Sequence, residues 1–116
     1  MIPNSGDDQR ALPRPDDRPR GVFLVTPADL VQVHEYFGGG GDYGLEDVGE
    51  LLGIGTVDRS GDWLRLCLSR SELKELKVAA DAYSFDYPAE LIEMCMDIIR
   101  GASAAPGESL EFLSNF

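Results

Sequence analysis

The apolar residues between positions 21 and 101 fall into segments whose spacing predicts both strands and helices. The run Val22-Phe23-Leu24-Val25 is continuous and rich in strand-forming residues, which predicts a buried strand. Residues 54–68 predict a β-hairpin around the turn Arg59-Ser60-Gly61. In its second strand Leu64, Leu66 and Leu68 alternate with Trp63, Arg65 and Cys67.

Apolar positions that recur every three or four residues predict four helices. The first helix is predicted to begin with Thr26 as its N-cap and Pro27 as its first helical residue. Its apolar face would contain Leu30, Val33, His34 and Phe37. The second helix covers about 43–52 and ends at Gly53. The third begins at Ser69 or Ser71 and ends at about 82, and the fourth covers 88–100. The predicted class is α+β: a small antiparallel sheet of about three strands covered by about four helices, in the order β-α-α-β-β-α-α.

The chain of 116 residues is long enough for one domain with its own core. Residues 1–20 are rich in Pro, Arg and Asp and nearly free of apolar side chains, which predicts a disordered arm. Residues 21–101 form the predicted globular α+β domain. Residues 102–116 are predicted to be a linker followed by a short C-terminal tail.

Asp and Glu outnumber Lys and Arg by 21 to 10, and the formal net charge is -11. This balance argues against binding to nucleic acid or to an anionic membrane, because both require a basic surface. The charge is concentrated in two acidic blocks, residues 21–53 and 83–116. The acids on the predicted helices of these blocks are Asp42, Glu46, Asp47 and Glu50 in the first and Glu90, Glu93 and Asp97 in the second.

Acids spaced three or four residues apart on a helix destabilise it by about 0.2–0.5 kcal/mol per pair. Two interpretations follow: a solvated face of a generally acidic protein, or a surface that docks onto a cationic partner and steers its approach.

Tyr83, Phe85 and Tyr87 share one side of an extended segment beside Asp86. They are either interface anchors or a crossover that closes the core. Trp63 begins its strand on the side away from the leucines, so we expect it to be a partly exposed anchor.

The sequence predicts no catalytic, cofactor-binding or metal-binding residues. His34, the single histidine, lies on an apolar stripe, which favours a core position over a base or a ligand. Cys67 and Cys95 lie in apolar segments, as buried thiols of a reducing compartment do, and the N-terminal residues lack a signal-peptide pattern. We therefore expect a cytoplasmic protein without enzymatic activity.

Two further motifs give only weak signals. The run Gly38–Gly41 has no following Lys-Ser or Lys-Thr pair, so a helix connector is favoured, with a weak cation site or a mobile binding loop as alternatives. Residues 44–54 are similar to the first helix and turn of helix-turn-helix domains. No recognition helix follows them, and basic residues are missing where phosphates would lie, so DNA binding is not expected.

The predicted function is a small acidic protein-binding module. More specifically, we expect a bacterial or phage inhibitor of the immunity or antitoxin type, which covers a basic surface of a nuclease or nucleic-acid-handling protein. The alternatives are a structural or regulatory subunit that forms a homodimer through helix 88–100, and a regulator that binds a small molecule or cation. No cofactor, nucleic acid or membrane is predicted as a partner.

Overall fold

The computed structural model describes residues 14–35, 44–103 and 108–115. Its elements in chain order are the 3-10 helix η1 (Pro15–Asp17), β1 (Gly21–Val25), β2 (Leu30–Glu35), α2 (Leu45–Leu52), β3 (Thr56–Asp58), β4 (Leu64–Ser69), α3 (Arg70–Ala82), α4 (Ala89–Ser103) and β5 (Ser109–Ser114). The α+β class is confirmed. The antiparallel sheet has five strands where about three were expected, and the described part has three α-helices where about four were expected.

The strand order of the sheet is β2-β1-β5-β4-β3, so the C-terminal strand lies at its centre. Phe23 of β1 is opposite Leu113 of β5, and Leu66 of β4 is opposite Phe112. The short tail predicted for the C-terminus is therefore wrong for residues 109–114. Phe112 and Leu113 are fully buried, because a central strand has neighbours on both edges and covered side chains on both faces.

The helix predicted after Thr26 and Pro27 is also wrong, because this segment is a hairpin turn followed by strand β2. The backbone N–H of Thr26 donates to the carbonyl of Asp29 at 3.0 Å, and the N–H of Asp29 donates to Oγ1 of Thr26 at 3.0 Å. A hydroxyl that caps a helix can equally close a turn. The prediction missed this second use of the Thr26 side chain.

An irregular register in β2 explains the apparent helical spacing of its apolar residues. His34 is opposite Val22 and Gln32 is opposite Phe23, which leaves Val33 as the extra residue of a β-bulge. Val33 packs against the main core and its side chain lies beside Gly101, while His34 contacts Asp97. Two consecutive residues of one strand therefore contact α4, which a regular strand would not allow.

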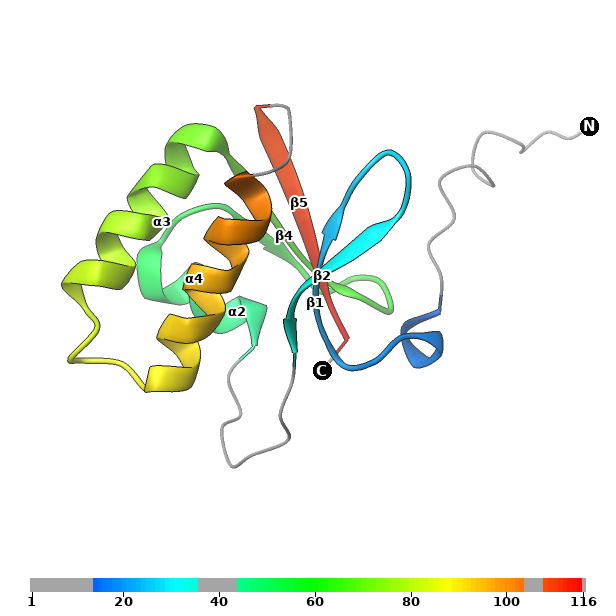
Figure 1. Ribbon diagram of the computed structural model, residues 1–116, viewed down its shortest axis with the longest axis horizontal. Coiled ribbons are helices and arrows are strands. Elements are labelled where there is room, and N and C mark those ends of the chain that lie inside the picture. Colours follow the sequence, from blue (N-terminus) through cyan, green and yellow to red (C-terminus); the bar gives the residue numbers. More distant parts are fainter. Residues whose placement is uncertain (1–13, 36–43, 104–107, 116) are drawn as a thin grey trace, which may run out of the picture.

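All three α-helices lie on one side of the sheet (Figure 1). The main core forms between the sheet and this helical layer. The sheet contributes Val22, Leu24, Leu66, Leu68, Leu110 and Phe112, and the helices contribute Leu45, Val48, Leu76, Ala80, Leu91, Met94, Cys95, Ile98, Ile99 and Ala102. Helix α4 supplies more of these residues than either of the other two α-helices.

Several local predictions are confirmed by the structure. Gly53 ends α2 in the left-handed conformation, with φ of 58°, which glycine adopts at little cost. Ser69 caps α3: its Oγ accepts from the N–H of Glu72 at 3.2 Å, and Glu72 accepts in return from the N–H of Ser69 at 2.8 Å. Strands β3 and β4 form the expected hairpin.

A second, smaller apolar cluster contains Phe23, Leu30, Trp63 and Leu113. Trp63 is only 4% exposed and meets the ring of Phe23 edge to face, with centroids 5.7 Å apart. The expectation that Trp63 is partly exposed is therefore wrong. Its side chain lies next to β1 and β5, where Phe23 and Leu113 provide an apolar surface that the sequence pattern of β4 alone does not reveal.

Residues 14–20 approach the end of β5 through Asn115. The Nδ2 group of Asn115 donates to the carbonyls of Pro15 and Pro19, both at 3.0 Å, and its Oδ1 accepts from the N–H of Gly21 at 2.8 Å. The last part of the predicted arm is thus fixed by hydrogen bonds. The rest of that arm, residues 1–13, lies outside the described residues.

Candidate protein-binding surface

The connection between α3 and α4, residues 83–88, presents three aromatic side chains to solvent; we call it the aromatic turn. Phe85 is 99% exposed, Tyr83 46% and Tyr87 36%. Of the two interpretations left by the sequence, a crossover that closes the core is inconsistent with these exposures. The aromatic turn lies at one end of the helical layer, where the chain passes from α3 to α4 (Figure 1).

Local contacts give the aromatic turn a defined shape. The N–H of Tyr83 donates to the carbonyl of Ala79 at 2.9 Å, which closes the last turn of α3. The N–H of Asp86 donates to the carbonyl of Tyr83, also at 2.9 Å. The rings of Tyr83 and Tyr87 meet nearly at right angles, with centroids 6.0 Å apart. Phe85 therefore projects from a turn whose two ends are held by the neighbouring tyrosines.

Acidic residues lie within the aromatic turn and on both sides of it in the sequence. Asp81, Asp86 and Glu90 are exposed, and the sequence has no Lys or Arg between Lys77 and Arg100. Glu93 is also exposed, one turn farther along α4. The aromatic turn and the start of α4 thus combine exposed aromatic rings with a net negative charge.

Asp97, the last acid of the α4 row, differs from Glu90 and Glu93 because it is engaged within the fold. Its side chain is 16% exposed, its Oδ2 lies 2.6 Å from Nδ1 of His34, and its Oδ1 pairs with Arg100. The structure therefore gives Asp97 a packing role between β2 and α4. This role does not require a partner.

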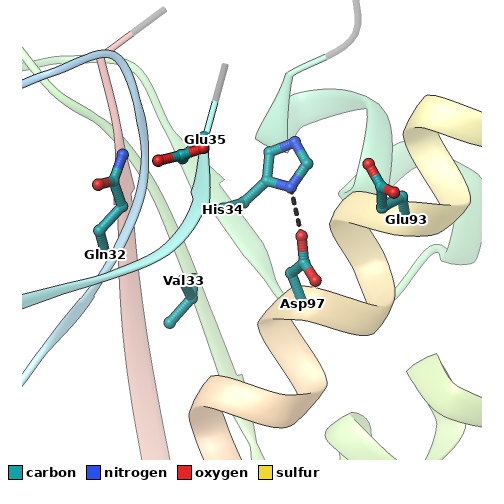
Figure 2. Close-up of a pocket in the computed structure, with 6 residues that line it drawn as sticks. All are labelled: Gln32, Val33, His34, Glu35, Glu93 and Asp97. Atoms are coloured by element: carbon teal, nitrogen blue, oxygen red, sulfur yellow. Dashed lines mark hydrogen bonds and ion pairs between the residues drawn. The ribbon is translucent and has the colours of Figure 1, made fainter. Parts of the chain in front are cut away.

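A shallow cavity of about 320 Å³ opens beside this contact, lined by Gln32, Val33, His34 and Glu35 of β2 and by Glu93 and Asp97 of α4. Figure 2 shows the carboxylates of Glu35 and Glu93 on either side of the His34 ring. The sequence did not predict Gln32 or Glu35 as site residues, because their place beside this cavity depends on the irregular register of β2, which the hydrophobic pattern does not reveal.

His34 is 7% exposed, and burial lowers the pKa of its imidazole, while the negative charges of Glu93 and Glu35 act in the opposite direction. The neutral ring still donates its Nδ1–H to Asp97, so this hydrogen bond does not require the charged form. The predicted core position of His34 is confirmed, although on a strand.

The acids predicted on the helix of the first block differ in their burial and in their hydrogen bonds. Asp47 accepts a hydrogen bond from the N–H of Gly44 at 2.7 Å and so caps α2, which gives it a structural role. Glu50 is exposed, whereas Glu46 is half-buried with one oxygen, Oε2, that lacks a hydrogen-bond partner in the described structure. Asp42 and the Gly38–Gly41 run lie outside the described residues. Among Glu46, Asp47 and Glu50, the last is therefore the carboxylate most accessible to a partner.

The cysteines are free thiols in different surroundings. Cys95 is buried in the main core, and burial raises its pKa to about 12. Cys67 is half-buried on β4, and burial also raises its pKa. Both thiols are therefore protonated and weakly nucleophilic at neutral pH. Within the described ranges, no group of three or more His, Cys, Asp or Glu side chains is placed to hold a metal ion.

Helix α4 offers little apolar surface for self-association, because its large apolar residues pack inside the fold. Ile92 and Met96 are the partly exposed apolar side chains of this helix. In the part of the chain that the structure describes, no helix has the length and apolarity to cross a membrane.

Comparison with protein-family models, with curated proteins and with solved structures found no match.

Proposed function

We propose that this protein is a protein-binding module that contacts its partner through the aromatic turn and the adjacent acids of α4. The observation that carries this proposal is the exposure of Phe85, whose ring is 99% accessible at the tip of a structured turn. An aromatic side chain of this size gains free energy when it is buried. At interfaces, such residues anchor the complex from the centre of the contact.

The charge around the aromatic turn defines the kind of partner. Asp86, Glu90 and Glu93 are exposed, and the nearest basic residues in the sequence are Lys77 and Arg100. A surface of this sign repels acidic proteins and nucleic acids and accelerates the approach of a basic one. The partner is therefore a protein with a basic surface that also offers an apolar slot for Phe85.

Nucleases and other nucleic-acid-handling proteins have such surfaces, because they must attract phosphates. We therefore propose an inhibitor of the immunity or antitoxin type, of bacterial or phage origin, which acts in the cytoplasm by covering that surface. The size of the chain and its net charge of -11 support this class. Self-association through α4 has less support, since the apolar residues of that helix are used inside the fold.

Affinity capture from a lysate of the source organism, at low and at high salt, tests the proposal. A basic protein that is retained by the wild type, released by salt and lost with Phe85→Ser supports it. The charge reversal Glu90→Lys with Glu93→Lys is the matched test of the acidic rim, and Glu46→Lys with Glu50→Lys tests the first acidic block. Capture by Phe85→Ser that equals capture by the wild type at low salt contradicts the proposed binding surface, whatever the result for the two charge reversals.

A further inference from the structure

Strand β2 is at the end of the sheet, so one of its edges has no partner strand among the described residues. The other edge strand, β3, is only three residues long, whereas β2 has six residues. Native edge strands are usually protected by lysine, proline or short length. The sequence Leu30–Glu35 has neither lysine nor proline, and Val31 is 50% exposed. Its bulge limits the regular part of this edge to residues 30–32.

The hydrogen bonds of the hairpin define which backbone groups of β2 point outward. Thr26 and Asp29 form the hydrogen-bonded pair that closes the turn. Pairs alternate along an antiparallel ladder, so Leu24 and Val31 form the next hydrogen-bonded pair. The N–H and C=O groups of Leu30 and Gln32 therefore point to the free edge, ahead of the bulge at Val33. The N–H of Leu30 donates to the carboxylate of Asp29, so the groups open to a partner are the C=O of Leu30 and both backbone groups of Gln32.

The cavity at His34 begins where this free edge ends. Gln32 and Glu35 line it from β2, and Glu93 lines it from α4 (Figure 2). Asp97 already pairs with Arg100 and contacts His34, but the carboxylates of Glu35 and Glu93 are exposed. At the other end of β2, the charge of Asp29 is compensated by Arg18 at 2.9 Å. The free edge is thus negative at its C-terminal end only.

From this placement we infer that the β2 edge binds an extended basic peptide segment by strand addition. The backbone of the segment pairs with the C=O of Leu30 and with both backbone groups of Gln32, and a Lys or Arg side chain that follows it enters the cavity between Glu35 and Glu93. Backbone pairing supplies the affinity, and the carboxylates select for positive charge. This inference depends on β2 and α4 and does not require the aromatic turn.

The test uses the full chain labelled with nitrogen-15 and titrated with a capped peptide of alternating valine and lysine. Strand addition shifts the amide signals of Leu30, Val31 and Gln32 and slows hydrogen exchange at Gln32, whose N–H gains an acceptor. A second peptide of equal charge, in which proline replaces the valines, cannot pair as a strand and is expected not to bind there. A third peptide, with glutamate in place of lysine, is expected to be repelled.

Variants separate this surface from the aromatic turn. Glu35→Gln and Glu93→Gln are each expected to weaken binding of the valine–lysine peptide about two- to fivefold, as loss of an exposed ion pair does. Glu75→Gln removes the same charge from the outer side of α3 and is expected to have no effect. Phe85→Ser is expected to leave peptide binding intact, so a failure of the proposed function is distinguishable from a failure of strand addition.

Three results overturn the inference: no binding of the valine–lysine peptide, equal binding of the proline peptide, or shifts that lie on other elements and spare residues 30–32. The second result would indicate attraction by charge alone.

Discussion

Nδ1 of His34 lies 2.6 Å from Oδ2 of Asp97, and this contact joins the edge strand β2 to helix α4. Both side chains are largely buried, at 7% and 16% exposure, so neither can replace its partner with bulk water at low cost. Asp97→Ala is therefore expected to lower the free energy of unfolding by about 1–3 kcal/mol in urea denaturation. Glu93→Ala, on the exposed side of the same helix, is the control. Equal effects of the two substitutions would show that the contact contributes nothing.

The same pair predicts a pH dependence of stability. Burial lowers the pKa of His34 in the folded chain, while the unfolded imidazole titrates near its ordinary value of about 6.5. When the pH falls through 6.5, the unfolded chain takes up a proton that the folded chain still refuses, so stability is lost. Urea denaturation at pH 7.5 and pH 6 is expected to show a larger loss for the wild type than for His34→Gln. A wild-type chain that becomes more stable on acidification, relative to this variant, would show that the direction is wrong.

Trp63 is expected to behave as a core residue. Its ring fills the small cluster with Phe23 and Leu113, so Trp63→Ala should cost about 3–5 kcal/mol of unfolding free energy. Trp63→Phe retains an aromatic ring and should cost less. Phe85→Ala, at a site 99% exposed, should change stability by no more than about 0.5 kcal/mol. Chemical denaturation measures the change in unfolding free energy of all three variants. A change of less than about 1 kcal/mol for Trp63→Ala would support the earlier expectation of an exposed anchor.

Strand β5 is expected to be indispensable for folding. It pairs with β1 and β4, so its loss divides the sheet into two hairpins with no strand between them. A chain that ends at Ser103 should therefore show no cooperative thermal unfolding by circular dichroism. Because a truncated chain can also fail through aggregation, Phe112→Ala in the full chain is the milder test, with an expected cost of about 3–5 kcal/mol. If the truncated chain and Phe112→Ala both unfold like the wild type, residues 109–114 contribute nothing to folding and form a tail, as first predicted.

The two strands that the sequence did not predict correctly, β2 and β5, share a physical cause. The spacing of Leu30, Val33 and His34 matches one face of a helix, and the bulge that produces this match depends on pairing with β1. For β5, the segment Ser109–Ser114 follows a linker-like stretch, and its burial depends on partner residues at least 40 positions away in the sequence. Both depend on tertiary contacts, which local patterns do not encode.

Elements with local signals were predicted well. Helix α3 begins at the capping box of Ser69 and Glu72, α2 ends at Gly53, and the β3–β4 hairpin follows its alternation and turn. Of the candidate site, the aromatic turn was visible in the sequence because Pro88 interrupts the helical pattern. The cavity beside His34 was not, since it depends on the register of β2 against α4.

The two thiols are expected to differ in reactivity. Burial raises the pKa of Cys95 to about 12, and its side chain is enclosed by the main core. A thiol-specific reagent such as DTNB should therefore modify Cys95 only after global unfolding, at a rate limited by that step. Cys67, which is half-buried on β4, should react first. In the Cys67→Ser variant, Cys95 is the thiol that remains. Rapid modification of Cys95 in this native variant would contradict the described packing.

The role of Phe85 is the central claim, and the affinity of the captured basic partner for purified variants tests it most directly. Phe85→Ser should weaken binding more than tenfold with an unchanged melting temperature, as expected for an interface anchor. Val78→Ser is the matched control, because Val78 is an exposed apolar residue on α3, 68% accessible and outside the aromatic turn. It should change affinity less than twofold. Equal affinity of the wild type and Phe85→Ser would contradict the proposed binding surface.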